Sequence, residues 1–140
     1  MKHIPMTNHN LEKISEEEKL ILLACKLIFT TLLVVYLGVM IYFSLIPGDE
    51  LIDTFIPKYS IILHFLEFIG LSLISILCLF LYDLKYPILY VSSLIIFMSI
   101  LTESIQYFIP GRFFSVIDLA VNLVGGLSLI VMIIIGRKRK

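Results

Sequence analysis

Six polar side chains stand inside otherwise apolar stretches of this 140-residue chain, and their types are those used in acid/base catalysis and in binding. They form three pairs, which are His64 with Glu67, Glu103 with Gln106, and Asp118 with Asn122. Spacings of three, three and four residues place each pair on one face of a helix. Arg112, on a short connection between two of the stretches, adds a planar, permanently charged fork that suits a phosphate or carboxylate.

Polar groups of this kind are informative because they are expensive inside a membrane. A charged side chain near the middle of a span costs about 2.5–3.5 kcal/mol on insertion scales. The alternative use of such residues is interhelical hydrogen bonding, measured at about 0.6 kcal/mol per contact. For a single residue the two interpretations balance. For six residues at one depth, among them three carboxyls and a histidine, the functional interpretation is favoured.

The chain that must position these residues is strongly apolar. Hydrophobic residues make up 59% and charged residues 16%, and the mean hydropathy is +1.03, whereas soluble domains are about 45–50% apolar and about 25% charged. Four apolar runs, 20–46, 60–82, 86–109 and 113–135, are each long enough to cross roughly 30 Å of hydrocarbon as a helix. We predict an all-α membrane protein, with a polar tail over 1–19, a membrane domain over 20–136 and a basic tail over 137–140. A separate soluble enzyme domain is excluded.

The ends of the runs carry helix start and stop signals. Ser15 followed by Glu18 is a capping-box pattern, and Pro47-Gly48-Asp49 ends the first run. The first run is far longer than the about 7–15 apolar residues of a cleaved signal peptide, so we expect it to be retained. Connections over 83–85 and 109–112 are short, which predicts an antiparallel four-transmembrane-helix bundle.

Basic residues indicate the orientation of the bundle. With four spans both termini share a side, and that side carries Lys2, Lys13, Lys19, Lys85, Arg137, Lys138, Arg139 and Lys140. The opposite side carries Lys58 and Arg112. We therefore expect both termini to be cytoplasmic in the plasma membrane, with the six polar side chains in the outer half. Eleven basic residues balance eleven acidic ones, so no nucleic-acid partner is expected.

The second half of the chain resembles the VanZ-like family of small integral membrane proteins. The resemblance is carried by Glu103-x-x-Gln106, by Pro110-Gly111-Arg112, and by Asp118-x-x-x-Asn122 followed by Gly125-Gly126. Ser44 to Pro47 and the run from His64 to Phe68 are similar to the family's first two spans, so the likeness covers roughly 25–136. One departure is Ser60-Ile61, where the family often shows Asp-Lys. The resemblance implies a small membrane protein linked to resistance to the glycopeptide teicoplanin. It does not imply a particular biochemical activity.

The first hypothesis for the polar residues is an enzyme that acts on a lipid-linked or anionic envelope substrate. Glu103, Asp118 and His64 would be the acid/base groups. The groups that hold the substrate would be Arg112, Gln106, Asn122 and Glu67. Ser115, also near the set, is of a type common at helix starts.

Other hypotheses remain open. The same groups could hold a membrane lipid, a lipid-linked envelope component or, through the resemblance, a glycopeptide antibiotic, with Arg112 paired to Glu103 or Asp118. A non-catalytic scaffold, whose polar cluster joins the helices, is the structural alternative. A carboxylate-rich metal centre is the least favoured because the set has one histidine and a nearby arginine, so no metal or cofactor is expected.

Two further expectations concern transport and packing. The first run, 20–46, contains no acidic residue for proton coupling, which argues against a transporter. Gly70, Gly125 and Gly126 are expected to be small-residue contacts that let helices approach closely.

Overall fold

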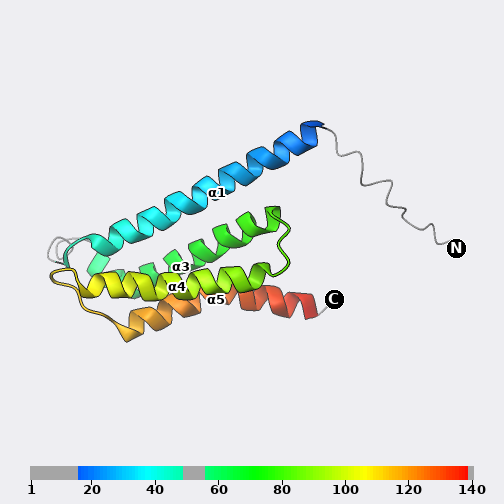
Figure 1. Cartoon of the computed structure of the whole chain (residues 1–140). Helices are drawn as coiled ribbons and strands as arrows, with labels where there is room; N and C mark the ends of the chain where they lie inside the picture. The colour runs from blue at the N-terminus through cyan, green and yellow to red at the C-terminus, as the bar shows by residue number, and fades with distance from the viewer. Residues whose placement is uncertain (1–15, 49–55, 139–140) are drawn as a thin grey trace.

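The computed structural model describes residues 16–48 and 56–138, with side chains at 16–48 and 61–137. In these ranges the chain forms four helices, α1 (Glu16–Leu45), α3 (Ile56–Leu81), α4 (Pro87–Tyr107) and α5 (Val116–Lys138), shown in Figure 1. Each helix is long and apolar enough to cross a membrane. The fold is therefore that of an all-helical protein compatible with several membrane passes.

The helix ends differ from the predicted runs by a few residues. Helix α1 begins at Glu16, inside the expected tail, and three glutamates in its first turn complement the positive end of the helix dipole. Ser15, the expected cap of this helix, lies outside the described residues. Helix α5 begins at Val116 and not at 113, because the side chain of Ser115 caps it.

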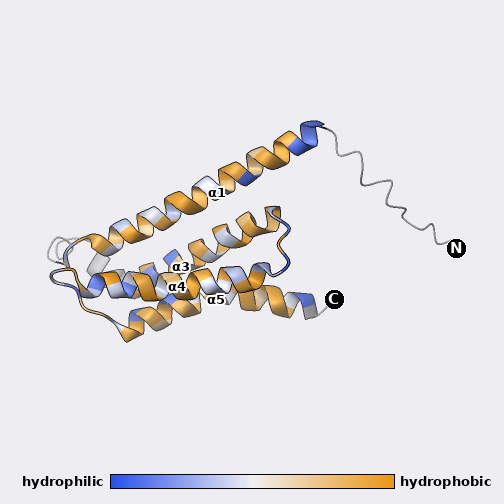
Figure 2. Ribbon diagram, viewed as in Figure 1, coloured by the Kyte–Doolittle hydropathy of each residue, from blue (hydrophilic) through white to orange (hydrophobic). Residues whose placement is uncertain are grey.

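The core takes most of its buried apolar side chains from α3 and α4, with one each from α1 and α5. Its buried apolar side chains are Met40, Phe68, Leu71, Val91, Ile95, Met98 and Ile130. Helix α1 contributes least, since its buried residues are Met40 and Ser44, and its first turns diverge from the other helices (Figure 1). The helices are apolar along most of their length, with hydrophilic residues at the start of α1 and the end of α5 (Figure 2). Apolar side chains such as Leu20 and Met132 are 68% exposed, as lipid-facing positions would be.

The three glycines expected at helix contacts do lie at such contacts. A Cβ on Gly125 of α5 would lie 2.6 Å from the backbone oxygen of Phe65 on α3. A Cβ on Gly126 would lie 2.5 Å from Cγ2 of Ile95 on α4. Gly70 faces the hydroxyl of Tyr36 on α1. Gly125 thus marks a close backbone approach of α5 to α3, whereas Gly126 and Gly70 make room for side chains of α4 and α1.

Two contacts join the end of α1 to the connection between α4 and α5. The Gly48 N–H donates to the oxygen of Pro110 at 3.0 Å, and Arg112 Nη2 donates to the oxygen of Phe43 at 3.2 Å. Gly111 has a φ of 74°, a conformation that favours glycine, and a Cβ on Gly48 would collide with its carbonyl group. These backbone contacts hold Arg112 at one end of the bundle.

Candidate functional site

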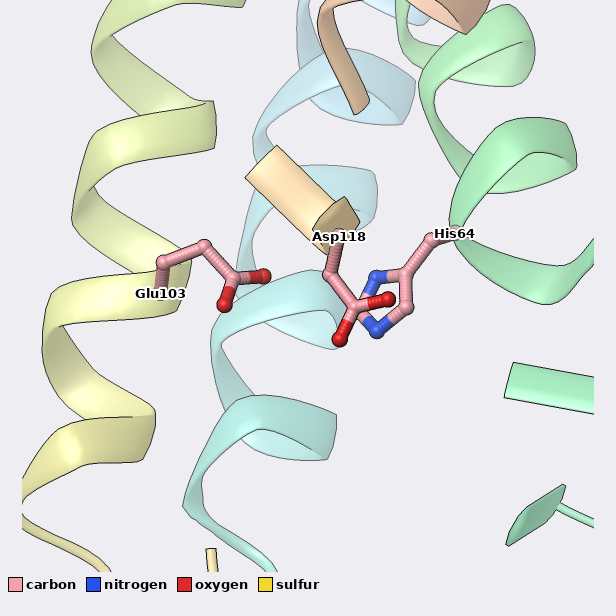
Figure 3. A group of neighbouring side chains, drawn as sticks. All are labelled: His64, Glu103 and Asp118. Carbon is pink, nitrogen blue, oxygen red and sulfur yellow. The ribbon is translucent and has the colours of Figure 1, made fainter. Parts of the chain in front are cut away.

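A polar cluster of three side chains forms where α3, α4 and α5 meet. His64 comes from α3, Glu103 from α4 and Asp118 from α5, and one ligand-type atom of each lies within 4.8 Å of the others. Figure 3 shows the two carboxylates and the imidazole ring directed toward one another. The three acid/base candidates of the sequence are therefore brought together, and we call them the polar cluster.

Glu103 is fully buried and is held by α5. Its Oε2 accepts the backbone N–H of Ser115 at 3.2 Å, and its Oε1 accepts Nδ2 of Asn122 at 3.4 Å. N–H donors on both oxygens compensate negative charge on a buried carboxylate. These two hydrogen bonds also tie the end of α4 to the beginning of α5.

The start of α5 explains why Asp118 points into the cluster. Ser115 Oγ accepts the backbone N–H of Asp118 at 3.1 Å, which is the first half of a capping box. In a complete capping box the acid at this position would accept the N–H of the capping residue, but here Glu103 accepts it. Within the described ranges the Asp118 carboxylate accepts no hydrogen bond, so it is available to a ligand.

Asn122 lies one turn beyond Asp118 on the same face of α5. Its side chain is fully buried, and its Nδ2 is directed at Glu103. Its Oδ1 accepts no hydrogen bond of standard geometry in the described part of the chain, although its side chain lies close to the imidazole of His64. A buried carbonyl oxygen without a donor is costly, at about 1–3 kcal/mol, and such a group needs an explanation.

The polar cluster borders a cavity of about 800 Å³. Its polar walls are formed by Ser44, His64, Glu67, Gln106, Arg112, Ser115 and Asp118. Its apolar walls come from α1 and α3, through Tyr36, Val39, Phe43, Leu63 and Leu66. Glu103 and Asn122 do not line it, because they are buried beside it. Of the seven polar residues expected at the site, five face the cavity and two support it.

Arg112 does not have the partner that the binding hypothesis assigned to it. No ion pair joins it to Glu103 or Asp118 within the described ranges, and its Nη2 donates to the backbone of Phe43. Partial burial lowers the pKa of the guanidinium, while the negative fields of Glu103 and Glu67 oppose this shift. A guanidinium has five N–H donors, so most of them remain for an anion in the cavity.

Two residues important to the site were not among those expected to form it. Ser115 caps α5 and donates to Glu103, and the spacing of Ser115 and Asp118 was the signal for its capping role. Tyr36 donates its hydroxyl to the backbone oxygen of Glu67 at 2.8 Å and forms the inner wall of the cavity. No pattern along the sequence indicates that contact, which depends on how α1 crosses α3.

Comparison with family models, with curated proteins and with solved structures finds no match to the chain. The class of this protein is therefore described from its fold and its site alone. Its described residues form four apolar helices that border a partly open cavity lined by carboxyls, a histidine and an arginine.

Proposed function

We propose that this protein is a multi-pass plasma-membrane protein that binds the anionic headgroup of a membrane lipid or lipid-linked envelope component. The observation that carries the proposal is the two-sided lining of the cavity. Arg112 stands among the polar lining residues, and apolar side chains of α1 and α3 form the rest of the wall. An amphipathic ligand has the same division into a charged head and an apolar chain.

The headgroup end of the ligand would contact Arg112. Its guanidinium is partly exposed, has no carboxylate partner among the described residues, and is fixed by its bond to Phe43. A planar fork of N–H donors matches the oxygens of a phosphate or carboxylate. Gln106 and Ser44, also on the cavity wall, offer further polar groups to a headgroup.

The apolar end of the ligand would pass between α1 and α3. Val39, Phe43, Leu63 and Leu66 line the cavity and are each at least 38% exposed, so this wall opens toward the surface of the bundle. In a membrane that surface faces acyl chains. A lipid could therefore place its headgroup in the cavity without withdrawing its chain from the bilayer.

The topology we propose is an antiparallel bundle with both termini in the cytoplasm, because basic residues are concentrated on that side. It puts the cavity in the outer half of the membrane. Reporter fusions after Lys140 and within 48–58 test this orientation. A reporter at the C-terminus that is active only outside the cell would place the cavity at the inner leaflet.

Chemical modification of the bound component is a finer form of the same proposal. Asp118 and His64 line the cavity and are the pair able to transfer a proton, whereas Glu103 is already held by two donors. Asp118→Asn preserves the shape of the side chain and removes its ionisation. Turnover of a bound lipid that is lost in this variant, with binding retained, would support catalysis.

The structural alternative is favoured by one observation. Glu103 joins α4 to α5 through Ser115 and Asn122, as a polar group serving only to hold helices together would do. A scaffold role predicts that variants of Arg112, which lies outside this network, have no effect on any bound lipid.

The resemblance to VanZ-like proteins supports a proposal about phenotype. A susceptible Gram-positive cell that expresses the chain would tolerate more teicoplanin, and the effect would depend on Arg112, Glu103 and Asp118. The minimum inhibitory concentration is measured for each variant at matched membrane abundance. Full resistance with Glu103→Gln and Asp118→Asn would exclude an acid/base role for both carboxyls.

Binding of an anionic lipid is the direct test of the proposal. Purified protein in neutral-lipid nanodiscs is titrated with a short-chain phosphatidylglycerol, and with the matching phosphatidylcholine as the uncharged comparison. We expect preference for the anionic lipid, a loss of about tenfold or more in Arg112→Gln, and a smaller loss in Arg112→Lys.

The matched control is Arg137→Gln, an exposed arginine in the last turn of α5. It should leave binding unchanged because it lies far along α5 from the cavity-lining Asp118. Equal affinity of wild type and Arg112→Gln for the anionic lipid would refute the proposed function.

A further inference from the structure

We propose that the polar cluster of His64, Glu103 and Asp118 is a three-ligand site for a divalent transition-metal ion, with Zn²⁺ the cation it fits best. The proposal stands on the cluster and its surroundings and does not require that the cavity bind a lipid. Each ligand comes from a different helix, α3, α4 and α5, so the ion would join three of the four helices.

The ligand types select the class of cation. One imidazole nitrogen with two carboxylate oxygens is a combination that zinc accepts, and catalytic zinc sites use three protein ligands with a fourth position left for water or substrate. The imidazole disfavours Mg²⁺ and Ca²⁺, which prefer oxygen ligands alone.

The geometry is close to what such an ion needs. The three candidate ligand atoms lie within 4.8 Å of one another. Around a tetrahedral zinc with bonds of about 2.0–2.2 Å, ligand atoms stand about 3.3–3.6 Å apart. Side-chain rotations that move the ligand atoms by about an ångström would bring them to this spacing.

Glu103 has the surroundings of a metal-binding carboxylate. Its two oxygens are oriented by the Ser115 N–H and by Asn122 Nδ2, and each oxygen keeps a second lone pair. Hydrogen bonds behind the ligands are a general feature of metal sites, because they fix the ligand in its binding orientation. Ser115 also holds the turn that carries Asp118.

A second and independent observation comes from acceptors that have no donor. The fully buried Oδ1 of Asn122 accepts no hydrogen bond of standard geometry in the part of the chain that is described, and its side chain lies beside the imidazole of His64 in the cluster. The Asp118 carboxylate likewise accepts no hydrogen bond within those residues, and Arg112 forms no ion pair with it. A network that served only as interhelical contact would pair these acceptors with donors. A cation among them would satisfy several at once.

Arg112, whose proximity made a metal centre the least favoured interpretation of the sequence, forms its side-chain hydrogen bond with α1. Its guanidinium donates to the oxygen of Phe43 on α1 and forms no ion pair with Glu103 or Asp118 in the described ranges, although it lies close enough for the field of Glu103 to act on it. Two of the ligands, His64 and Asp118, line the cavity, whereas Glu103 is buried behind them. The open coordination position would therefore face the cavity that Arg112 also lines.

Direct metal binding tests the proposal with the cation as the only probe. The full chain contains three histidines, so the protein is made with His3→Gln and His9→Gln, which leaves His64 as the only imidazole. It is stripped with a chelator in neutral-lipid nanodiscs and titrated with ZnCl₂ by calorimetry. We expect about one zinc ion per chain. Co²⁺ titration should give the visible absorption bands of a four-coordinate site, and MgCl₂ should not compete.

Variants then assign the ligands. We expect each of three variants, His64→Gln, Glu103→Gln and Asp118→Asn, to weaken zinc binding by at least about tenfold. Losses of about 10–100-fold are typical when a residue that hydrogen-bonds to a metal ligand is replaced, so loss of a ligand should cost at least as much. The matched control is Glu67→Gln, which removes a carboxyl from the same cavity wall but outside the cluster. It should weaken zinc binding much less than the cluster variants do, because it removes the field of a nearby charge and no ligand atom.

Two results would overturn the proposal. One is the absence of stoichiometric zinc binding by the folded protein with native His64, a result that depends on no variant folding. The other is an equal loss in Glu67→Gln and in the cluster variants. Zinc binding without anionic-lipid binding would support this inference and refute the proposed function. Anionic-lipid binding without zinc binding would support the proposed function and refute this inference.

Discussion

The backbone N–H of Ser115 donates to Oε2 of Glu103 across the contact between α5 and α4, at 3.2 Å. A carboxylate from one helix thus caps the first turn of another, in the place that Asp118 would occupy in a local capping box. Glu103 and Asp118 therefore have different roles. Glu103 stabilises the start of α5, and Asp118 is left facing the cavity.

The first prediction concerns the cap of α5. Ser115→Ala removes the acceptor for the Asp118 N–H and should lower the free energy of unfolding by about 0.5–2 kcal/mol. Reversible unfolding in mixed micelles measures it, with Ser115→Thr expected near wild type. Ser128→Ala is the control, because Ser128 bonds only to the carbonyl of Gly125 within α5. Equal effects of the two alanine variants would contradict the cap.

The second prediction concerns the pairing of Glu103 with Asn122. Glu103→Gln leaves one acceptor oxygen where two N–H donors converge, so it should cost about 1–3 kcal/mol of stability. Adding Asn122→Asp reverses the polarity of the pair, because the new amide then donates to the new carboxylate. The double variant should be more stable than the sum of the single variants predicts. Additive losses in a double-mutant cycle would show that the two side chains are not coupled.

The third prediction separates two neighbouring glycines. Gly125→Ala places a methyl group 2.6 Å from the backbone oxygen of Phe65. Because that oxygen can move only together with α3, the variant should lower the free energy of unfolding by about 1–3 kcal/mol. Gly126→Ala meets the side chain of Ile95, which can adjust, so its cost should be smaller.

The control for this pair is Gly38→Ala on α1, where no atom lies within 4 Å of the added methyl. Alanine is the better helix former there and should stabilise by about 0.5–1 kcal/mol. Unfolding measured for all three variants gives the expected order. A larger loss for Gly126→Ala than for Gly125→Ala would mean that α3 and α5 are further apart than described.

The fourth prediction concerns the joint between α1 and the connection of α4 to α5. Gly48→Ala would drive a methyl group into the carbonyl of Gly111, so the bond from Gly48 to Pro110 should break and Arg112 should shift. Anionic-lipid binding in this variant should fall, with little change in the zinc binding that we propose for the polar cluster. Retained binding with native affinity would show that Arg112 is positioned independently of α1.

Much of the fold follows from the sequence because hydropathy acts on each helix separately. The four runs were located within a few residues, and spacings of three and four residues placed each polar pair on one face. The burial of Glu103 and the exposure of Glu67 to the cavity were not predictable, since both depend on how the helices rotate against one another. The contact of Arg112 with Phe43 was also missed, because a backbone carbonyl leaves no mark in the sequence.

The contact between Glu103 and α5 can form only late in the synthesis of the chain. Chains emerge from the ribosome N-terminus first, so α4 is made before the residues that pair with its buried carboxyl. Until α5 follows, Glu103 lacks both Ser115 and Asn122 as partners. In the proposed membrane topology, addition of α5 is therefore the step that gives the buried carboxyl of α4 its partners, and a nascent chain arrested before Val116 would leave that carboxyl facing lipid.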